Sequence, residues 1–384
     1  MTRSISILGA TGSIGASTLD LIRRERSKWR VVALTANDNA AELAKLVREF
    51  DAELAVVADE ARLPQLREAL AGRDVEIAAG ADALCDAASR ATDLTVGAIV
   101  GCAGLRPTMH AITRGGIVAL ANKEALVSAG EVMTAAVARH GATLLPMDSE
   151  HNAIFQCLQG HRIEDVARIT LTASGGPFRG WSLEQLETAT PAQAVAHPNW
   201  DMGAKISVDS ATMMNKGLEF IEAHHLFPVG LDRLRIIIHP QSVIHSLVEY
   251  RDHSTLAQLG PSDMRVPIAS CLAWPARMDT PMQALDLAAI GELTFHAPDE
   301  QRFPATRLCR EAIEAGGAAP AVLNAANEVA VAAFLAGQIA FTKIPVMVEQ
   351  ALTRYAPAAP ASLDDVLNVD REARECAGEL LETA

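Results

Sequence analysis

The sequence predicts an α/β protein whose N-terminal part is a doubly wound parallel sheet. Short apolar runs of strand length alternate with amphipathic segments of helical period between residues 5 and 145. The hydrophobic fraction is 49% and the aromatic fraction only 4%, a composition typical of helices packed on a parallel sheet. A chain of 384 residues is also long for one core, so two or three domains are expected.

Six apolar runs are expected to form the strands of this sheet. Helical segments such as residues 39–49 separate them, because parallel neighbours need crossover connections. The predicted strands are residues 5–8, 31–34, 54–57, 96–100, 117–120 and 144–145.

Glycines at positions 9, 12 and 15 follow the first strand at once, and a helix is expected from about residue 16 to residue 24. Glycine lets the backbone approach a pyrophosphate, and the first amides of the helix would face that anion. The spacing departs from the usual G-x-G-x-x-G. Because strand, turn and helix follow in order, we interpret the segment as a Rossmann-like dinucleotide-binding unit; the alternative is a plain glycine-rich turn.

Acidic residues directly follow the apolar run near residue 145. Asp148 and Glu150 are separated by Ser149, so both carboxylates can reach one hard cation, and Glu219 would complete three oxygen ligands. The alternative is that Asp148 or Ser149 caps a helix beginning near His151, with Glu150 in its first turn.

The segment 197–219 concentrates polar side chains. Residues 206–208 form a short alternating run, and helical character begins at Ser210, so Asn215 and Glu219 share one helical face, with Lys216 beside them. An amide, an ammonium and a carboxylate can hold a phosphate at one end and a metal at the other. For an isolated Asn215–Lys216 pair, a solvated helix face is the alternative.

The remaining patterns complete the domain organisation. Runs at 168–172 and 235–239 predict a second, smaller sheet. Proline and acidic residues break the pattern between 276 and 300, and the rest is helical, with Gly337 as a stop and Ser362 as a start. The expected division is 1–147, 148–275 and 301–384, with 276–300 as a linker.

Charge and cysteine content narrow the class of protein. The net charge of −14 argues against nucleic acid as a partner, so an anionic substrate needs a local cationic pocket, which Lys123 and Lys216 would supply. The six cysteines show no C-x-x-C pair, which indicates reduced thiols and a cytoplasmic protein. The chain enters its first strand almost at once, and no apolar run is long enough to span a bilayer, so neither a leader peptide nor a membrane partner is expected.

Six motifs along nearly the whole chain carry a family resemblance. They are Gly-Ala-Thr-Gly-Ser-Ile-Gly at 9–15, Ala-Asn-Lys-Glu-Ala-Leu-Val at 121–127, Met-Asp-Ser-Glu-His at 147–151, Thr-Ala-Ser-Gly-Gly-Pro-Phe at 172–178, the run 197–219, and Asn-Ala-Ala-Asn-Glu-Val-Ala at 324–330. Together they resemble the 1-deoxy-D-xylulose 5-phosphate reductoisomerase family of the methylerythritol phosphate route to isoprenoids. The resemblance implies a Rossmann-like NADPH-binding domain, a central α+β catalytic, metal-binding and dimerisation domain with a mobile lid, and a C-terminal helical domain.

The resemblance also implies a metal site and a phosphate site. Asp148, Glu150 and Glu219 would bind one divalent cation, Mn²⁺, Mg²⁺ or Co²⁺, for which oxygen ligands are suited. The cation would act as a Lewis acid on the hydroxyl and carbonyl oxygens of a small phosphorylated sugar. The catalytic positions carried over are Lys123, Asp148, Glu150, Glu219 and His197, and the substrate positions are Lys123, Ser149, Glu150, Ser174, His197, Trp200, Ser210, Asn215, Lys216 and Glu219.

His197 and Trp200 belong to the segment that would close as a lid, with Gly175, Gly176 and Gly180 at its beginning. Exclusion of water matters because the first step moves a carbon fragment, by an α-ketol shift or by retro-aldol cleavage and re-addition, and creates an aldehyde. Hydride transfer would then give 2-C-methyl-D-erythritol 4-phosphate. The alternatives are that His197 caps a turn before Pro198, that Trp200 is a core or interface aromatic, and that Lys123 merely starts an exposed helix.

The cofactor implied is NADPH. One departure concerns residues 37–39, which read Asn-Asp-Asn where many relatives carry Gly-Lys-Asn. An acid about 20 residues past the glycine loop usually favours NAD by binding the ribose 2′-hydroxyl. Asp38 can instead point to solvent while Asn37 and Asn39 donate to a 2′-phosphate. The carried-over cofactor positions are Thr11, Gly12, Ser13, Ile14, Asn39, Asn122, Glu124 and Gly203.

Two other functions stay open at this stage. The first is a simple NAD(P)-dependent dehydrogenase of a phosphorylated aldehyde or ketone. Asp148, Glu150 and Glu219 argue against it, because hydride transfer alone needs no metal. The second is a catalytically silent nucleotide-binding protein. The presence of the three acids together with Lys123 and Lys216 argues against it, because such a protein need not keep them. A homodimer is implied by the resemblance alone.

Overall fold

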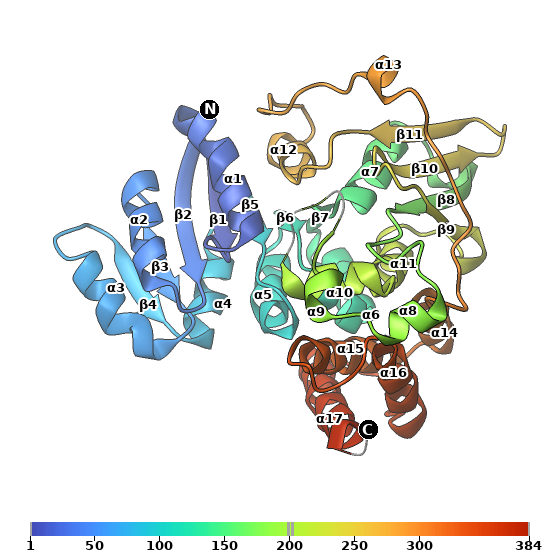
Figure 1. The fold of residues 1–384 in the computed structure, drawn as a ribbon. Helices are drawn as coiled ribbons and strands as arrows, with labels where there is room; N and C mark the ends of the chain where they lie inside the picture. The colour runs from blue at the N-terminus through green and yellow to red at the C-terminus, as the bar shows by residue number, and fades with distance from the viewer. Residues whose placement is uncertain (1, 198–199, 201–202, 383–384) are drawn as a thin grey trace. The chain divides into compact units, whose positions relative to one another are not determined.

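The computed structural model describes residues 2–197, 200 and 203–382, and its parts form two compact units (Figure 1). The first unit contains Met1–Ala125, Met133–Asn152 and Met264–Met282; the second contains Leu126–Val132, Ala153–Asp263 and Gln283–Ala384. This division by compactness differs from the predicted domain boundaries at 147, 275 and 300, which stay a prediction. In particular, helix α12 (Arg265–Ala273) belongs to the first unit, where Arg265 pairs with Asp20 at 3.1 Å.

The first unit contains the predicted doubly wound parallel sheet. Its seven strands follow the order β4-β3-β2-β1-β5-β6-β7, and every neighbouring pair is parallel. Strand β4 was not predicted, because Glu76 is exposed and the other three residues are only partly buried, so the segment has little apolar signal. The strands are β1 (Arg3–Leu8), β2 (Trp29–Ala36), β3 (Leu54–Val57), β4 (Glu76–Ala79), β5 (Leu94–Gly97), β6 (Ile117–Leu120) and β7 (Thr143–Pro146).

Helices connect these strands, and polar caps set several of their ends. Asn39 begins the second helix by accepting a hydrogen bond from the Glu42 amide, and Asp51 ends it in the left-handed conformation at φ 45°. Leu43, Ala44, Val47 and Phe50 then face the sheet. The helices are α1 (Ser13–Arg24), α2 (Ala40–Phe50), α3 (Leu63–Ala69), α4 (Ala81–Ser89), α5 (Leu105–Arg114) and α6 (Lys123–His140).

The second unit contains the smaller sheet in the order β11-β10-β8-β9. Strand β8 (Val166–Ala173) is parallel to β9 (Leu234–Ile238), and both predicted runs are therefore confirmed as strands. An unpredicted hairpin adds β10 (Ile244–Tyr250), antiparallel to β8, and β11 (Thr255–Leu259). Helix α7 (Ser149–Leu158) begins in the first unit and continues into the second.

The segment 203–226 corrects one prediction. The alternating residues 206–208 lie in helix α10 (Ala204–Ala211), so their alternation is not a strand. Ser210 ends that helix instead of starting the next, because Met213 adopts φ 65° and breaks the chain direction. Helix α11 (Met214–Leu226) then carries Asn215 and Glu219 one turn apart, as predicted.

The C-terminal part is helical, as expected. Ser362 caps its last helix: its hydroxyl accepts from the Asp365 amide at 3.2 Å, and the Asp365 carboxylate accepts from the Ser362 amide at 3.0 Å. Gly337 follows the longest apolar helix at φ 73°. The remaining helices are α8 (Leu183–Glu187), α9 (Pro191–Ala194), α13 (Leu287–Ile290), α14 (Ala305–Ala315), α15 (Ala319–Leu335), α16 (Lys343–Arg354) and α17 (Leu363–Glu382).

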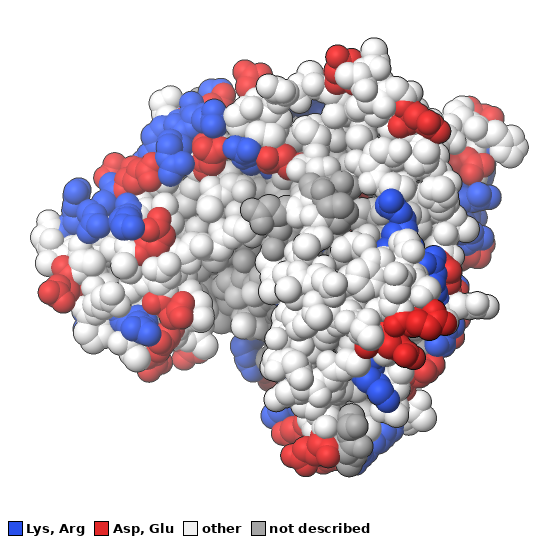
Figure 2. Space-filling view, in the orientation of Figure 1, with Lys and Arg blue, Asp and Glu red and all other residues white. Residues whose placement is uncertain are grey.

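Charged side chains of both signs lie at the surface (Figure 2). Acidic and basic side chains are interspersed over the face drawn in Figure 2. Many basic groups have acidic partners; Arg23, for example, pairs with Glu49, and Arg24 pairs with Asp20 at 3.4 Å. No helix among the described residues is long and apolar enough to cross a membrane.

Candidate active site

The glycine loop of the first unit is shaped for an anion. Gly9 has φ 89°, and a Cβ there would lie 2.7 Å from the Ala98 carbonyl oxygen. Gly12 is the exposed N-cap of α1, and no side chain caps that helix end. The first amides of α1 are therefore open to a pyrophosphate, with Thr11, Ser13 and Ile14 around the tip.

Gly15 lies directly against the backbone of the glycine loop, so a larger residue at this position should displace the loop. A Cβ at Gly15 would overlap the Gly9 carbonyl oxygen and approach Ala10 Cα to 2.6 Å. Gly15→Ala should therefore destabilise the protein by about 1–3 kcal/mol and weaken NADPH binding, because the loop must shift. Thermal melting and a fluorescence titration with NADPH measure both effects. Gly378→Ala is the control, since a Cβ there meets nothing within 4 Å; equal behaviour of the two variants would contradict the predicted role of Gly15.

The loop after β2 lies at the expected 2′-phosphate position. Asn37, Asp38 and Asn39 are exposed. The Asn39 side-chain oxygen Oδ1 caps α2 by accepting from the Glu42 amide at 3.1 Å, which leaves the side-chain NH₂ group as a donor for an anion. Asp38 is exposed as well, so the loop offers the Asn37 and Asn39 amides beside one exposed carboxylate.

The start of α6 combines a structural cap with a buried lysine. Asn122 accepts from the Ala125 amide and donates to the carbonyls of Ile99 at 2.6 Å and Gly101 at 2.8 Å. Its side chain therefore fixes the junction between strand and helix. Lys123 is only 6% exposed, so the alternative of an exposed helix start is wrong for Lys123. Glu124 lies in the first turn beside it and is partly buried.

Asp148 uses its two carboxylate oxygens differently. Oδ1 accepts from the amides of Glu150 at 3.0 Å and His151 at 3.4 Å, so Asp148 caps α7 as the alternative interpretation proposed. Oδ2 lies 2.8 Å from Lys123 Nζ. Capping therefore leaves one oxygen facing a buried ammonium. Ser149 donates to Glu150 Oε2 at 2.7 Å and holds that carboxylate on the first turn.

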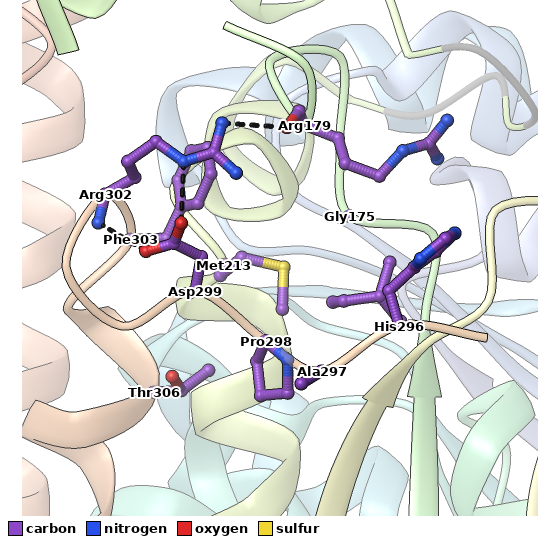
Figure 3. Close-up of a pocket in the computed structure, with 11 residues that line it drawn as sticks. Gly175, Arg179, Met213, His296, Ala297, Pro298, Asp299, Arg302, Phe303 and Thr306 are labelled. Atoms are coloured by element: carbon purple, nitrogen blue, oxygen red, sulfur yellow. Dashed lines mark hydrogen bonds and ion pairs between the residues drawn. The ribbon is translucent and has the colours of Figure 1, made fainter. Parts of the chain in front are cut away.

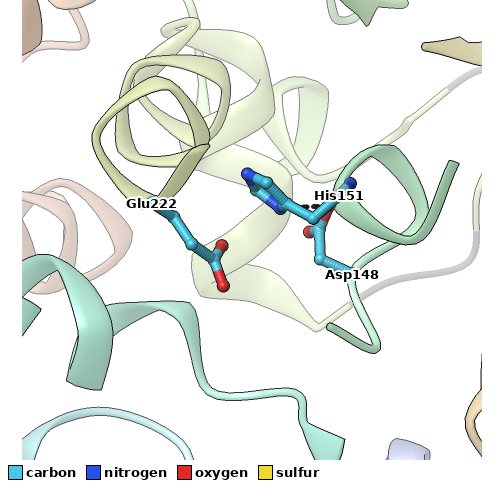
Figure 4. A group of neighbouring side chains, drawn as sticks. All are labelled: Asp148, His151 and Glu222. Atoms are coloured by element: carbon cyan, nitrogen blue, oxygen red, sulfur yellow. Dashed lines mark hydrogen bonds and ion pairs between the residues drawn. The ribbon is translucent and has the colours of Figure 1, made fainter. Parts of the chain in front are cut away.

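His151 and Glu222 are buried titratable residues that the sequence analysis did not single out. His151 Nδ1 lies 3.1 Å from Asp148 Oδ1, and the dashed line in Figure 4 marks this contact. Glu222 is 1% exposed and lies one turn beyond Glu219 on α11. The i, i+3 spacing of Glu219 and Glu222 was the signal that could have found the second acid.

The second unit contributes a charged cluster on α11. Lys216 is 4% exposed, Glu219 is 1% exposed and Asn215 is partly buried, so the alternative of a solvated face for Asn215 and Lys216 is wrong. Asn215 Nδ2 donates to Glu219 Oε1 at 2.6 Å, and Lys216 Nζ donates to Oε2. An amide and an ammonium thus hold the carboxylate that the sequence assigns to a metal.

Ser174, His197 and Trp200 form a hydrogen-bonded chain in the second unit. The Trp200 amide donates to His197 Nδ1 at 3.0 Å, so Nε2 carries the proton and donates to Ser174 Oγ at 3.0 Å. Burial lowers the pKa of His197, which favours this neutral form. His197 therefore caps a turn, as the alternative proposed, while its other nitrogen contacts Ser174. Pro198 itself lies outside the described residues.

The Ser174 loop packs against the end of α10. Gly175 and Gly176 have φ 84° and 68°, and a Cβ at Gly176 would lie 2.6 Å from the Ser210 carbonyl oxygen. Only glycine permits this approach, which brings the backbones of two predicted phosphate-binding segments together. Gly203, the exposed N-cap of α10, follows the lid segment.

These features define a class of protein. An uncapped helix at a glycine loop suits a dinucleotide, and buried carboxylates paired with lysines suit a hard cation and an anionic substrate. The chain therefore has the parts of a metal-assisted enzyme that uses a nicotinamide cofactor.

Comparison with known proteins identifies the family. Models described as 1-deoxy-D-xylulose 5-phosphate reductoisomerase, its C-terminal domain, and the DXP reductoisomerase C-terminal domain match residues 5–130, 144–227 and 259–376. Proteins with the name 1-deoxy-D-xylulose 5-phosphate reductoisomerase from Zymomonas mobilis and Afipia carboxidovorans are 58% and 56% identical over 99% of this chain and 98% and 94% of their own lengths. The chain belongs to the 1-deoxy-D-xylulose 5-phosphate reductoisomerase family.

Solved structures agree. The Zymomonas mobilis reductoisomerase in complex with NADPH matches with a TM-score of 0.96 and 56% identity over 100% of both chains. A reductoisomerase in complex with NADPH, fosmidomycin and magnesium matches with a TM-score of 0.93 and 43% identity, over 99% of this chain and 98% of the other. The predicted fold class and family are therefore confirmed.

Proposed function

We propose that this chain converts 1-deoxy-D-xylulose 5-phosphate to 2-C-methyl-D-erythritol 4-phosphate by rearrangement and NADPH-dependent reduction, in isoprenoid precursor biosynthesis. Full-length similarity to reductoisomerases carries the proposal, including structures with NADPH, magnesium and the substrate analogue fosmidomycin. The enzyme depends on NADPH and on a divalent cation. The buried acids and lysines of both units support the same reaction.

Two of the three acids fit a divalent cation because each already faces a positive charge. Asp148 faces the Lys123 ammonium, and Glu219 is held by Lys216 and Asn215, so a cation can substitute for these partners without leaving a buried carboxylate unpaired. We assign Asp148, Glu150 and Glu219 to the ion, Mg²⁺, Mn²⁺ or Co²⁺. When bound, the ion supplies Lewis-acid polarisation of the substrate oxygens.

The phosphate end of the substrate is assigned to the second unit. Ser174, Ser210, Asn215 and Lys216 supply hydroxyl, amide and ammonium donors, and His197 donates from the nitrogen that now contacts Ser174. Lys216 would leave Glu219 to the cation and turn to the phosphate. Ser149 would contact the substrate beside Glu150.

Trp200 of the lid segment and Lys123 are assigned to the part of the substrate where the reaction takes place. Trp200 presents a large apolar ring that excludes water from the aldehyde formed by rearrangement. Lys123 places a positive charge beside the substrate oxygens. Without it, the only charged group of this pair near those oxygens would be the Asp148 carboxylate. The α-ketol and retro-aldol routes both need these two contributions.

The dinucleotide is assigned to the first unit and the edge of the lid. Thr11, Gly12, Ser13 and Ile14 surround the uncapped start of α1, which suits the pyrophosphate. NADPH supplies the hydride for the second step. The remaining proposed contacts are Asn39 at the 2′-phosphate and Asn122, Glu124 and Gly203 towards the nicotinamide.

Asp38 should weaken the preference for NADPH. Its exposed carboxylate stands beside the Asn39 amide, so it repels a 2′-phosphate. Asp38→Lys is expected to raise the ratio of kcat/KM for NADPH over NADH at least about tenfold, the effect of one charge-assisted hydrogen bond. Glu68→Lys, which makes the same charge change on the exposed face of α3, should leave the ratio unchanged. A ratio that rises equally in both variants would mean that overall charge, and not this loop, sets selectivity.

The function is tested by following oxidation of NADPH, and separately of NADH, by metal-stripped protein with 1-deoxy-D-xylulose 5-phosphate, before and after Mn²⁺ or Mg²⁺ is added. We expect metal-dependent oxidation with formation of 2-C-methyl-D-erythritol 4-phosphate. Oxidation of the cofactor at the same rate with and without the metal would favour a simple dehydrogenase of a phosphorylated aldehyde or ketone. No oxidation by folded, metal-loaded protein would sink the proposal.

We also propose a cytoplasmic homodimer, on the family resemblance and the reduced thiols. All six cysteines are thiols in the structure. Light scattering or sedimentation of the purified protein tests the dimer, and a monomeric mass at micromolar concentration would contradict it.

A further inference from the structure

Arg302 fastens the beginning of the lid segment to the C-terminal part of the second unit. Its guanidinium donates to the carbonyl of Arg179 at 3.0 Å (Figure 3) and also to the carbonyl of Trp181 at 2.7 Å. The same group contacts Asp299 at 2.8 Å through Nε. One planar guanidinium thus joins three acceptors, which a lysine ammonium cannot do in the same geometry.

Asp299 holds Arg302 in this position. Its Oδ1 accepts from the amides of Gln301 at 3.1 Å and Arg302 at 3.0 Å, while Oδ2 accepts from the Arg302 side chain. These bonds lower the pKa of Asp299, with the Arg302 amide as the largest cause, so the carboxylate stays ionised. Residues 299–302 are therefore a preformed support for the guanidinium.

A second arginine continues the connection to Ser174. Arg179 Nη1 donates to the Ser174 carbonyl at 2.9 Å, and Ser174 Oγ contacts His197. Arg302 holds the backbone of Arg179, and Arg179 holds the backbone of Ser174. Asp299, Arg302, Arg179 and Ser174 are therefore connected in series, and Ser174 is a residue assigned to the substrate phosphate.

A cavity borders the same loop, with Arg179 in its wall. A space of about 290 Å³ lies beneath Gly175 and is lined by Arg179, Met213 and Phe303 among others (Figure 3). The loop is tightly packed at Gly176 against α10, and at Gly175 it lies against the side chains of Arg179 and Ile238. On the cavity side the Arg179 side chain is therefore a support of this loop, and its hydrogen bond to the Ser174 carbonyl fixes the two together.

We propose that Arg302 is a positioning residue for the substrate phosphate, acting through Arg179 on the Ser174 loop and the base of the lid. The inference rests on the proposed function and deepens it. Arg302 touches neither substrate nor cofactor in this scheme. Its loss should therefore displace Ser174 and weaken phosphate binding while the glycine loop of the first unit keeps its affinity for NADPH.

The test compares Arg302→Gln and Arg302→Lys with Arg307→Gln in the metal-loaded enzyme. Arg307 is a matched control, because it pairs with Glu311 and Glu349 at 3.0 Å and none of these bonds reaches the lid. We expect Arg302→Gln to raise the KM for 1-deoxy-D-xylulose 5-phosphate and the inhibition constant of fosmidomycin by about 10- to 100-fold, as a misplaced binding group does. The KM for NADPH and the melting temperature should match those of Arg307→Gln.

Hydrogen exchange gives an independent readout. Amides of residues 174–182 should exchange faster in Arg302→Gln than in Arg307→Gln, because their anchor is lost. If Arg302→Gln fails to fold, Arg302→Lys decides: it keeps the charge but not the three-way geometry, so a raised substrate KM supports the inference and a wild-type KM overturns it. An active wild-type enzyme with an unaffected Arg302→Gln variant overturns this inference alone. An inactive wild-type enzyme overturns the proposed function, and the inference with it.

Discussion

Asp148→Asn is expected to lower kcat/KM at least about 1,000-fold, because a divalent cation supplies several kcal/mol of transition-state stabilisation and this variant loses an anionic ligand. The melting temperature should stay near the wild-type value. Asparagine can still accept from the Glu150 and His151 amides through its side-chain oxygen, so α7 keeps its cap. The variant thus separates the capping role of Asp148 from its proposed metal role.

Steady-state kinetics over a range of Mg²⁺ concentrations measures the effect. The variant should need much more Mg²⁺ for its residual activity, whereas the KM for NADPH should change little. Asp286→Asn is the control, because Asp286 likewise caps a short helix by accepting from the Ala289 amide at 3.0 Å. Wild-type turnover in Asp148→Asn would show that capping is its whole role and would remove it from the metal site.

Local sequence patterns predicted the strand, the glycine loop and the helix at the start of the first unit well. The first strand, the glycine loop and α1 are adjacent in the chain, so apolar runs and glycine positions contain most of the information. The i, i+4 relation of Asn215 and Glu219 was likewise visible, because helical geometry relates them without tertiary contacts.

The failures have physical reasons. Residues 206–208 alternate like a strand, but the segment between Gly203 and Thr212 forms a helix whose buried side packs on α15. The fully buried His151 contributes nothing to an apolar pattern, so its contact with Asp148 depends on the fold of α7. Arg302 lies in a segment predicted to start the C-terminal helices, and its partners Arg179 and Trp181 are over 100 residues away in sequence.

Lys216→Gln should impair both stability and substrate binding. It removes the ammonium that Glu219 faces in a buried pair, and breaking such a pair costs about 3–5 kcal/mol, because one charge stays buried and unpaired. The melting temperature of the metal-free protein should therefore fall. The KM for 1-deoxy-D-xylulose 5-phosphate should rise by about 100-fold, since a charge-assisted contact to the phosphate is lost as well.

Two comparisons distinguish the structural cost from the functional one. Adding Mg²⁺ should raise the melting temperature of Lys216→Gln more than that of the wild type, because the ion then neutralises Glu219 and a ligand that binds only the folded state stabilises it. The double variant Lys216→Gln/Glu219→Gln should recover stability without metal but remain inactive. Arg374→Gln is the control for the loss of an ion pair elsewhere, since Arg374 contacts Asp370 at 2.8 Å and Glu328 at 2.6 Å; it should lower the melting temperature and leave the substrate KM unchanged. If Lys216→Gln behaved like Arg374→Gln, with stability lost and KM unchanged, Lys216 would be only the partner of Glu219, and the phosphate would have to be held by the hydroxyl and amide donors alone.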